Sequence, residues 1–320
     1  MHASGGRSGE TGAMRVLVTG GAGFIGSNLV DALVARDHDV VVLDDLTTGY
    51  AENVHPDARL VVADVADAEA VAAAAAGAET VFHLAASRAV LRSVQQPLAT
   101  DRTNTAGTLT VLEAARQAGA RRVISTSSSS VYGGVAPTPT PETAPVHPRS
   151  PYAVSKLAGE HYARVYWELH GLETVALRLF NVFGPRQRPD SAYAAVIPLF
   201  VDALRSGDAP EVHGDGLQSR DFTYIDDTVA GYLAAAAAPA ERCAGKVYNI
   251  AGGAEHSLLD LLDALQRILG TAIAPLHTDP RPGDVRRSCA DATAARQDLE
   301  WSARVGFEDG LERTVAWFTR

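Results

Sequence analysis

A tyrosine and a lysine four residues apart are the residues of this chain whose types and spacing best suit chemistry. Tyr152 and Lys156 stand in the phrase Tyr-Ala-Val-Ser-Lys, and this spacing places both side chains on one face of a helix. A phenol titrates near pH ~10 and is a poor base at neutral pH, but a neighbouring ammonium favours the phenolate. The pair is therefore predicted to remove or return the proton of an alcohol hydroxyl. Many amphipathic helices carry a half-buried tyrosine beside a lysine without any catalytic role.

A glycine-rich turn near the start of the chain predicts a dinucleotide site. The apolar run 15–19 leads into Gly20-Gly-Ala-Gly-Phe-Ile-Gly26 and then into a predicted helix over about 24–36. Glycines let backbone N–H groups approach a pyrophosphate at a helix N-terminus. The next apolar run, 40–43, ends in Asp44-Asp45, and an acidic residue there hydrogen-bonds a ribose 2′-hydroxyl and favours NAD over NADP. These features in this order are a stronger signal than a glycine motif alone.

Two further residues follow predicted strands. Asp64 comes after the run 59–63 and is a candidate partner for the adenine amino group, although a helix N-cap is an equally good interpretation of an aspartate there. His83 follows the apolar run 80–82 and is interpreted as a structural histidine rather than a catalyst.

With these pieces assembled, the chain resembles the extended short-chain dehydrogenase/reductase family. Within that family it is similar to the NAD-dependent nucleotide-sugar epimerase/dehydratase branch, near the UDP-hexose 4-epimerases. The resemblance runs from about Met14 to the C-terminus. Its motifs are T-G-G-A-G-F-I-G, L-D-D-L, H-L-A-A, N-x-x-G-T, S-S-S-S-V-Y-G, P-Y-A-V-S-K, L-F-N-V-F-G-P, S-R-D-F-T-Y-I-D-D and R-P-G-D.

The resemblance implies a catalytic set of Ser128, Tyr152 and Lys156. Ser128 would hydrogen-bond the sugar oxygen. Lys156 would bind the nicotinamide ribose and keep the pKa of Tyr152 low. Asn104 would order a nearby helix or a water. The residues expected to contact NAD are Gly20, Gly23, Phe24, Ile25, Gly26, Asp44, Asp45, Asp64, Val65, Leu84, Ala85, Ala86, Asn104, Tyr152 and Lys156.

The resemblance also implies how a sugar nucleotide is held. Asn181 would contact the phosphate or the sugar, and Asp284 would contact the uridine ribose. Arg220 and Arg281 would hold the diphosphate, which suits planar guanidinium donors.

Two more residues are assigned to the sugar. Ser288 stands where the family places a pocket residue facing the sugar, and a small residue there leaves room for a 2-acetamido group, so N-acetylated hexoses are expected to fit. Arg88 departs from related chains and is assigned to the substrate without a defined role.

The residues after Ser128 separate the activities within the branch. Ser129-Ser130 stand where sugar 4,6-dehydratases carry Asp-Glu or a lone Glu, and a hydroxyl cannot do a carboxylate's acid–base work at its ordinary pKa. The favoured activity is therefore inversion of C-4 of a UDP-hexose, either glucose/galactose or the N-acetylated pair, through a transient 4-keto sugar. A UDP-uronic acid 4-epimerase, another dehydratase or reductase of the family, and a non-catalytic NAD sensor are the alternatives.

The order of apolar runs and helical segments predicts an α/β fold with a Rossmann-type, doubly wound parallel sheet. Strands are expected near 15–19, 40–43, 59–63, 80–84, 121–126 and 173–178. The predicted organisation is a disordered tail over 1–13, an NAD-binding domain over 14–180 and a smaller substrate-binding lobe over 181–320, from which about 222–250 returns to the first domain. Helices near 97–118 and 150–170 are expected to pair in a homodimer.

Composition limits the partners. The net charge of −10 disfavours nucleic acid and anionic membranes, and no run reaches the ~18 apolar residues that span a bilayer. Residues 1–13 lack the apolar core of a signal peptide. The two cysteines, Cys243 and Cys289, have no metal-type spacing and favour a reducing, cytoplasmic location.

Overall fold

A computed structural model of the chain describes residues 13–319 except 89, 188–194 and 281–284. The predicted tail, apart from residue 13, lies outside the described residues. So do Arg281 and Asp284, the predicted diphosphate and ribose contacts.

The core of the molecule is a seven-stranded parallel sheet with the strand order β11-β6-β5-β4-β1-β2-β3. The chain leaves β3 and re-enters the sheet at β4 on the other side of β1, which places a topological switch point between β1 and β4. The predicted doubly wound α/β fold is thus confirmed. The strands are β1 (Arg15–Thr19), β2 (Asp39–Asp44), β3 (Arg59–Val62), β4 (Thr80–His83), β5 (Arg122–Ser128), β6 (Glu173–Leu179) and β11 (Lys246–Ile250).

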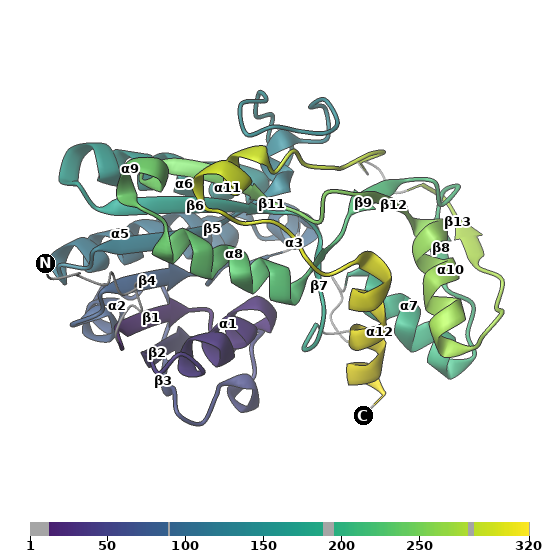
Figure 1. The fold of residues 1–320 in the computed structure, drawn as a ribbon, viewed down its shortest axis with the longest axis horizontal. Helices are drawn as coiled ribbons and strands as arrows, with labels where there is room; N and C mark the ends of the chain where they lie inside the picture. Colours follow the sequence, from purple (N-terminus) through teal and green to yellow (C-terminus); the bar gives the residue numbers. More distant parts are fainter. Residues whose placement is uncertain (1–12, 89, 188–194, 281–284, 320) are drawn as a thin grey trace, which may run out of the picture.

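Helices cover both faces of this sheet (Figure 1). On one face lie α1 (Phe24–Val34) and α8 (Ile225–Ala237); on the other lie α2 (Ala68–Ala75), α5 (Gly107–Gln117) and α6 (Pro151–His170). Alternate strand residues supply the two layers, because side chains of a strand point to opposite faces. In β1, Val16 and Val18 pack with the first helix layer and Leu17 with the second.

The helix that carries Tyr152 has well-defined ends. Ser150 caps α6 by accepting a hydrogen bond from the Ala153 N–H at 3.1 Å, and Pro151 occupies the first helical position, where its missing N–H costs nothing. The helix ends at Gly171, whose φ of 68° is readily adopted only by glycine. These signals fix the start of α6 and therefore the position of Tyr152.

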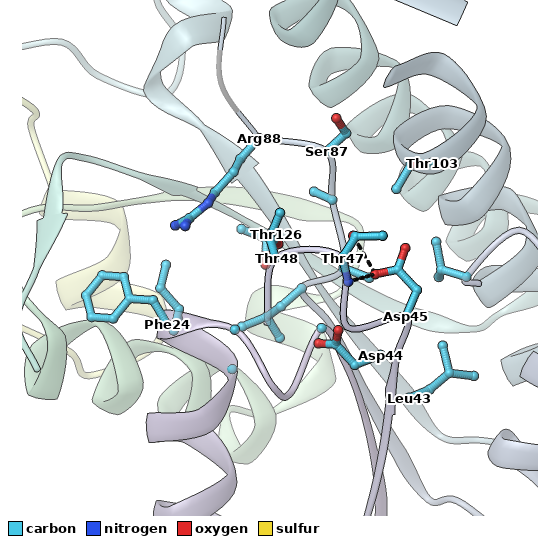
Figure 2. A pocket seen from close by; sticks show the side chains of 18 of the residues that line it. Phe24, Leu43, Asp44, Asp45, Thr47, Thr48, Ser87, Arg88, Thr103 and Thr126 are labelled. Carbon is cyan, nitrogen blue, oxygen red and sulfur yellow. Dashed lines mark hydrogen bonds between the residues drawn. The ribbon is translucent and has the colours of Figure 1, made fainter. Parts of the chain in front are cut away.

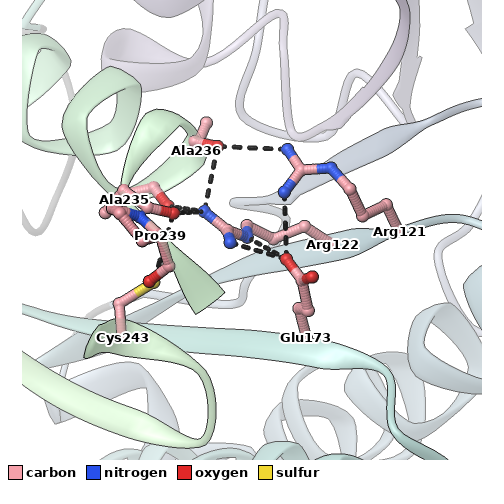
Figure 3. A network of polar contacts seen from close by, with 8 residues as sticks. Arg121, Arg122, Glu173, Ala235, Ala236, Pro239 and Cys243 are labelled. Atoms are coloured by element: carbon pink, nitrogen blue, oxygen red, sulfur yellow. Dashed lines mark hydrogen bonds and ion pairs between the residues drawn. The ribbon is translucent and has the colours of Figure 1, made fainter. Parts of the chain in front are cut away.

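A buried arginine fixes α8 against the sheet (Figure 3). Arg122 Nη1 donates to the carbonyls of Ala235, Ala236 and Ala238 at 2.8, 3.0 and 2.6 Å, and its Nη2 pairs with Glu173 at 2.6 Å. A cation at a helix C-terminus interacts favourably with the helix dipole. The contact ties α8 to β5 and β6.

A smaller lobe lies beyond the carboxyl ends of the strands, at the right of Figure 1. It contains three two-stranded sheets and three longer helices. The strand pairs are β7 (Val182–Phe183) with β10 (Thr223–Tyr224), β8 (Glu211–His213) with β13 (Leu276–Thr278), and β9 (Ser219–Asp221) with β12 (Glu255–Ser257). The helices are α7 (Val196–Ser206), α10 (Leu258–Leu269) and α12 (Phe307–Phe318).

The remaining described helices are short. They are η1 (Ala51–Asn53), α3 (Val90–Gln95), α4 (Pro97–Asp101), the π-helical turn η2 (Arg102–Ala106), η3 (Ser129–Tyr132), α9 (Ala240–Cys243) and α11 (Thr293–Asp298). The segments α4, η2 and α5 follow one another directly and match the helix predicted over 97–118. The seventh strand, β11, is absent from the six strands predicted, because Lys246-Val-Tyr-Asn-Ile250 is not a continuous apolar run.

Candidate active site

A cavity of about 310 Å³ opens at the carboxyl ends of the central strands (Figure 2). Its position at the switch point is where open α/β sheets bind ligands. Its lining includes most of the residues predicted to contact NAD. They are Gly20, Gly23, Phe24, Ile25, Gly26, Asp44, Asp45, Val65, Leu84, Ala85 and Ala86.

The glycine turn fits the pyrophosphate of a dinucleotide. Gly20 has a φ of +73°, and a Cβ there would lie 2.6 Å from the Ala85 nitrogen; a Cβ on Gly26 would lie 2.1 Å from the Gly20 oxygen. Gly23, by contrast, has only the Gly20 oxygen near its Cβ position, at 3.3 Å. Gly23 is also the N-cap of α1 and makes no side-chain cap hydrogen bond. The first amides of α1 are thus left for an anion at the positive end of the helix dipole.

Asp44 and Asp45 lie at the end of β2 on the cavity wall. Asp44 is oriented by two backbone amides, because its Oδ2 accepts from Ala22 at 3.0 Å and its Oδ1 from Leu46 at 2.9 Å. Asp45 is exposed, and its Oδ1 accepts from the N–H and the hydroxyl of Thr47 (Figure 2). Carboxylate oxygens accept more than one hydrogen bond each, so both residues fit the ribose hydroxyls of NAD.

The structure decides one of the two interpretations of Asp64. The N-cap interpretation is wrong, since Asp67 caps α2 by accepting from Glu69 and Ala70. The Asp64 carboxylate accepts from the Ala66 N–H at 2.8 Å and pairs with Arg102. Its neighbours Ala63 and Val65 line the cavity, and the adenine contact stays a prediction.

His83 and Asn104 form a buried layer beneath the cavity. The two His83 ring nitrogens are hydrogen-bonded to the Thr19 and Thr108 hydroxyls at 2.8 and 2.9 Å, and burial lowers the pKa of His83 to about 3. The structural interpretation of this histidine is confirmed. Asn104 accepts from the Ser87 N–H at 2.7 Å and donates to the Ser155 hydroxyl at 2.9 Å. It thereby joins the loop after β4 to α6.

The three predicted catalytic residues lie next to this cavity, although none of them is among its lining residues. The Ser128 side chain, at the end of β5, is near enough to Tyr152 to lower the pKa of its phenol. The Lys156 ammonium donates to the Thr126 carbonyl at 2.9 Å and lies 5.9 Å from the centre of the Tyr152 ring. Thr126 lines the cavity. An ammonium has three donors, so Lys156 can also bind ribose hydroxyls.

The electrostatics of the site differ from the expectation that Lys156 keeps Tyr152 acidic. Burial raises the pKa of Tyr152, and the opposing influences are the Ser128 side chain and the positive charge of Arg88. Burial also lowers the pKa of Lys156 to about 8, with the Glu160 carboxylate acting in the other direction. The physical reason is burial, which disfavours the charged forms of both the phenol and the ammonium; the Lys156 ammonium is itself hydrogen-bonded to the Thr126 carbonyl.

A buried ion pair supports α6 from behind. Arg178 Nε and Nη2 donate to the two Glu160 carboxylate oxygens at 2.8 and 2.7 Å. The Ser127 hydroxyl also donates to Glu160, and Arg178 Nη1 donates to the Tyr132 hydroxyl at 2.8 Å. Such satisfied networks hold a unique arrangement, and this one fixes the turn of helix next to Lys156.

The predicted substrate contacts that the structure describes lie in the smaller lobe, with the exception of Arg88 and Ser128. Asn181 Nδ2 donates to the Asp221 carbonyl at 2.9 Å. Arg220 Nη1 donates to the Val285 carbonyl at 2.6 Å, and Ser288 is half-buried next to Cys289. Arg88 lines the dinucleotide cavity, extending toward the side where Phe24 lies (Figure 2).

Several cavity residues were missed in the sequence. Thr126 had a signal, because it belongs to the hydroxyl-rich run before Ser128. Thr47 and Thr48 directly follow the Asp44-Asp45 pair. The residues on the opposite wall come from α3, α4 and η2, for which no motif pointed to a ligand: Arg92, Gln96, Ala99 and Thr103.

Comparison with known proteins identifies the family. The model of the family "NAD dependent epimerase/dehydratase" matches residues 16–251. The chain belongs to this family. The resemblance seen in the sequence motifs is therefore confirmed, and NAD is the cofactor that the family uses.

Individual relatives match almost the whole chain. A UDP-glucose 4-epimerase of Mycolicibacterium smegmatis is 43% identical over 95% of this chain and 98% of its own. The crystal structure of a UDP-glucose 4-epimerase from Thermotoga maritima with UDP-glucose has a TM-score of 0.92 at 37% identity, covering 96% of this chain and 99% of that chain. A UDP-N-acetylglucosamine 4-epimerase from Methanobrevibacter ruminantium, in complex with UDP-N-acetylmuramic acid, has a TM-score of 0.90 at 37% identity, covering 96% and 98%. Dehydratases are also similar: a dTDP-glucose 4,6-dehydratase of Streptomyces niveus is 36% identical over 95% of this chain and 93% of its own.

Two general features complete the description of the site. Within residues 13–319, apart from 89, 188–194 and 281–284, no cluster of three or more His, Cys, Asp or Glu side chains could hold a metal ion. In the same part of the chain, none of the helices combines the length and apolar character needed to cross a membrane.

Proposed function

We propose that this protein is an NAD-dependent epimerase that inverts C-4 of a UDP-hexose through a transient 4-keto sugar. The observation that carries the proposal is the position of buried Lys156, 5.9 Å from the centre of the Tyr152 ring and hydrogen-bonded to the carbonyl of Thr126, which lines the dinucleotide cavity. The Ser128 side chain adds to it by lowering the pKa of the Tyr152 phenol. Among the described residues that line the cavity, the carboxylates are Asp44 and Asp45. Both lie at the end of β2 and not beside Tyr152. A dehydratase would need an acid next to the sugar, and Ser129 and Ser130 stand in that place.

The chemistry of the chain's own residues follows from this arrangement. Tyr152 takes the proton of the sugar 4-hydroxyl, and Ser128 holds the same oxygen. Bound NAD supplies a hydride acceptor that later returns the hydride, and its positive ring favours the phenolate. The 4-keto sugar turns about its diphosphate link, which Arg220 holds, so that the hydride would return to the opposite face of C-4 while Tyr152 returns the proton to the C-4 oxygen. Configuration inverts without net oxidation.

The test is incubation of the purified protein with a panel of UDP-hexoses, followed by proton NMR of the products. We expect UDP-glucose and UDP-galactose to interconvert with no NAD added and none consumed, because the cofactor is regenerated in each turnover. A product that has lost water would favour a dehydratase, and stoichiometric formation of NADH would favour a dehydrogenase. Bound NAD without any change in a sugar nucleotide would favour a sensor.

UDP-glucuronic acid belongs in the same panel because a uronic acid epimerase is the second enzymatic alternative. Arg186, in the Gly-Pro-Arg-Gln-Arg-Pro-Asp stretch that suggests such an enzyme, pairs with Asp31 of α1 at 2.7 Å. That contact engages this guanidinium outside the cavity, while Arg188 of the same stretch lies outside the described residues. The panel therefore decides between the hexose and the uronic acid.

We also propose that the protein is a cytoplasmic homodimer formed through α4 to α6. Leu98 on α4 is 85% exposed and Leu169 on α6 is 72% exposed, and large apolar side chains on neighbouring helices favour an interface. Both cysteines are buried and unpaired, which suits a reducing compartment. Light scattering of the wild type and of a Leu169→Lys variant tests the dimer, which the charged side chain should dissociate.

A further inference from the structure

A buried carboxylate in the smaller lobe joins three segments that are distant in the sequence. Asp221 is fully buried at the end of β9. Its Oδ1 accepts from the Gly253 N–H at 3.0 Å, and its Oδ2 accepts from the Ala290 N–H at 3.1 Å. Its backbone carbonyl accepts from the Asn181 side chain at 2.9 Å. The segments around residues 181, 253 and 290 therefore converge on one residue.

The three predicted substrate contacts of this lobe are adjacent to these hydrogen bonds. Asn181 is one of the donors, Arg220 precedes Asp221 in β9, and Ser288 lies two residues before Ala290. Asn181 also has a φ of 31°, which is a sparsely populated conformation that needs support from its surroundings. The hydrogen bond to the Asp221 carbonyl supplies such support.

We propose that Asp221 is a positioning residue whose ionised carboxylate assembles the diphosphate and sugar contacts of the lobe. This inference rests on the proposed function, because it takes Asn181, Arg220 and Ser288, the substrate contacts predicted from the sequence, as contacts of the UDP-hexose. Asp221 does not contact the substrate itself: its carboxylate acts through the Gly253 and Ala290 amides, and its backbone carbonyl holds the Asn181 side chain. Each amide needs an acceptor, and a protonated carboxyl group presents a donor on one of its two oxygens.

The surroundings of Asp221 make this carboxylate sensitive to pH. Burial raises its pKa to about 6, against the hydrogen bonds from the Ala290 and Gly253 amides and the influence of the Cys289 side chain. On the neighbouring strand β12, Glu255 is paired with Arg287 and hydrogen-bonded to the Ser219 hydroxyl. His256 lies opposite Arg220 in the same strand pair, and burial lowers the pKa of this histidine.

The effect of Asp221 protonation on the stability of the fold can be distinguished from its effect on substrate binding. A carboxyl group whose pKa is raised on folding contributes stability at low pH, and that contribution is lost as the pH rises through about 6. Protonation of Asp221 should therefore not weaken the fold. If the ionised form assembles the site, however, substrate affinity should fall below pH 6. Protonation of Asp221 should not lower the melting temperature over the same range.

The experiment is titration calorimetry with UDP-glucose between pH 5 and pH 8, using the full-length protein with its cofactor. The bridging diphosphate of this probe does not titrate in that range. With a pKa of about 6 and only the ionised form competent, we expect the dissociation constant to rise about tenfold from pH 7 to pH 5. Asp221→Asn should bind UDP-glucose about tenfold more weakly at pH 8, and its affinity should no longer depend on pH. Its NAD content should be unchanged, and its KM should rise rather than its kcat fall.

Two further variants complete the test. Asp215→Asn removes another aspartate of the same lobe, one that pairs with Arg286 on the surface, and should behave as the wild type. Cys289→Ala removes a neighbouring thiol that lowers the pKa of Asp221, so the loss of affinity should begin at a higher pH. This variant tests the inference if Asp221→Asn does not fold.

The outcomes are distinct. Affinity that is independent of pH in the wild type, or an Asp221→Asn variant with wild-type affinity and pH dependence, overturns the inference alone. Absence of UDP-glucose binding at every pH overturns the proposed function, and the inference with it.

Discussion

The dinucleotide cavity is formed by strand ends that follow one another along the first part of the chain, whereas the substrate side joins segments that are far apart in the sequence. On the dinucleotide side, the turns after β1, β2, β3 and β4 each contribute backbone and small side chains. On the substrate side, Asn181, β9 and the segment before Ala290 meet at Asp221. The first arrangement is a property of the parallel sheet, and the second depends on a buried polar contact.

This difference implies that the two sides bind their ligands independently. The cavity wall is backed by the sheet and its two helix layers, so changes in the smaller lobe should leave NAD binding intact. Tyr152 lies between the two sides, at the start of α6. Variants can therefore be chosen to affect the first side, the second side, or the chemistry between them.

The largest expected effect comes from Tyr152→Phe. Loss of the phenolic oxygen removes the group that moves the proton, so kcat should fall on the order of 10³-fold or more. NAD content and the dissociation constant of UDP-glucose should change little, because neither side of the site is altered. Tyr162→Phe is the matched control, since this tyrosine is on the same helix but packs against the core between the sheet, α2 and α5. Substantial residual turnover in Tyr152→Phe would contradict the proposed chemistry.

Gly23→Ala should affect the dinucleotide side alone. The added Cβ would meet only the Gly20 oxygen, at 3.3 Å, so the fold should persist, but the methyl group obstructs the approach of a pyrophosphate to the first amides of α1. We expect NAD affinity to fall on the order of tenfold or more, since charge-assisted hydrogen bonds are weakened, while UDP-glucose affinity is retained.

Gly26→Ala is the contrasting variant. Its Cβ would lie 2.1 Å from the Gly20 oxygen, so this change should lower the melting temperature as well as NAD affinity. Equal thermal stability of the two variants, measured by circular dichroism, would contradict the account of the turn.

The same contrast explains what the sequence could predict. The strand–glycine–helix–strand–aspartate order is local, so the fold and most of the cavity wall could be predicted from it. The ion pair of Asp64 with Arg102 could not, because Arg102 belongs to a π-helical turn that no pattern indicated. Asp221 had no signal as a positioning residue either, since the amides whose hydrogen bonds it accepts come from residues 253 and 290. The raised pKa of Tyr152 depends on burial, which spacing alone does not determine.

Ser288→Tyr should affect the substrate side alone. A large aromatic side chain in place of this half-buried serine would fill the space proposed for a 2-acetamido group. We expect kcat/KM for UDP-N-acetylglucosamine to fall about tenfold or more relative to that for UDP-glucose, with NAD content unchanged. Ser206→Tyr, at the exposed end of α7, is the control for adding a tyrosine to this lobe. An equal loss for both sugars would place Ser288 away from the acetamido group.

Arg88→Met should produce the smallest change, and it probes the boundary between the two sides. Burial raises the pKa of Tyr152, while the positive charge of Arg88 lowers it. Removing that charge should raise the pKa further, so the acidic limb of the kcat–pH profile should move to higher pH. Arg88→Lys keeps the charge and should keep the profile close to that of the wild type. If both variants have the wild-type profile, Arg88 does not act on the Tyr152 phenol during turnover. Its place in the cavity would then serve the binding of NAD or of the substrate rather than the proton transfer.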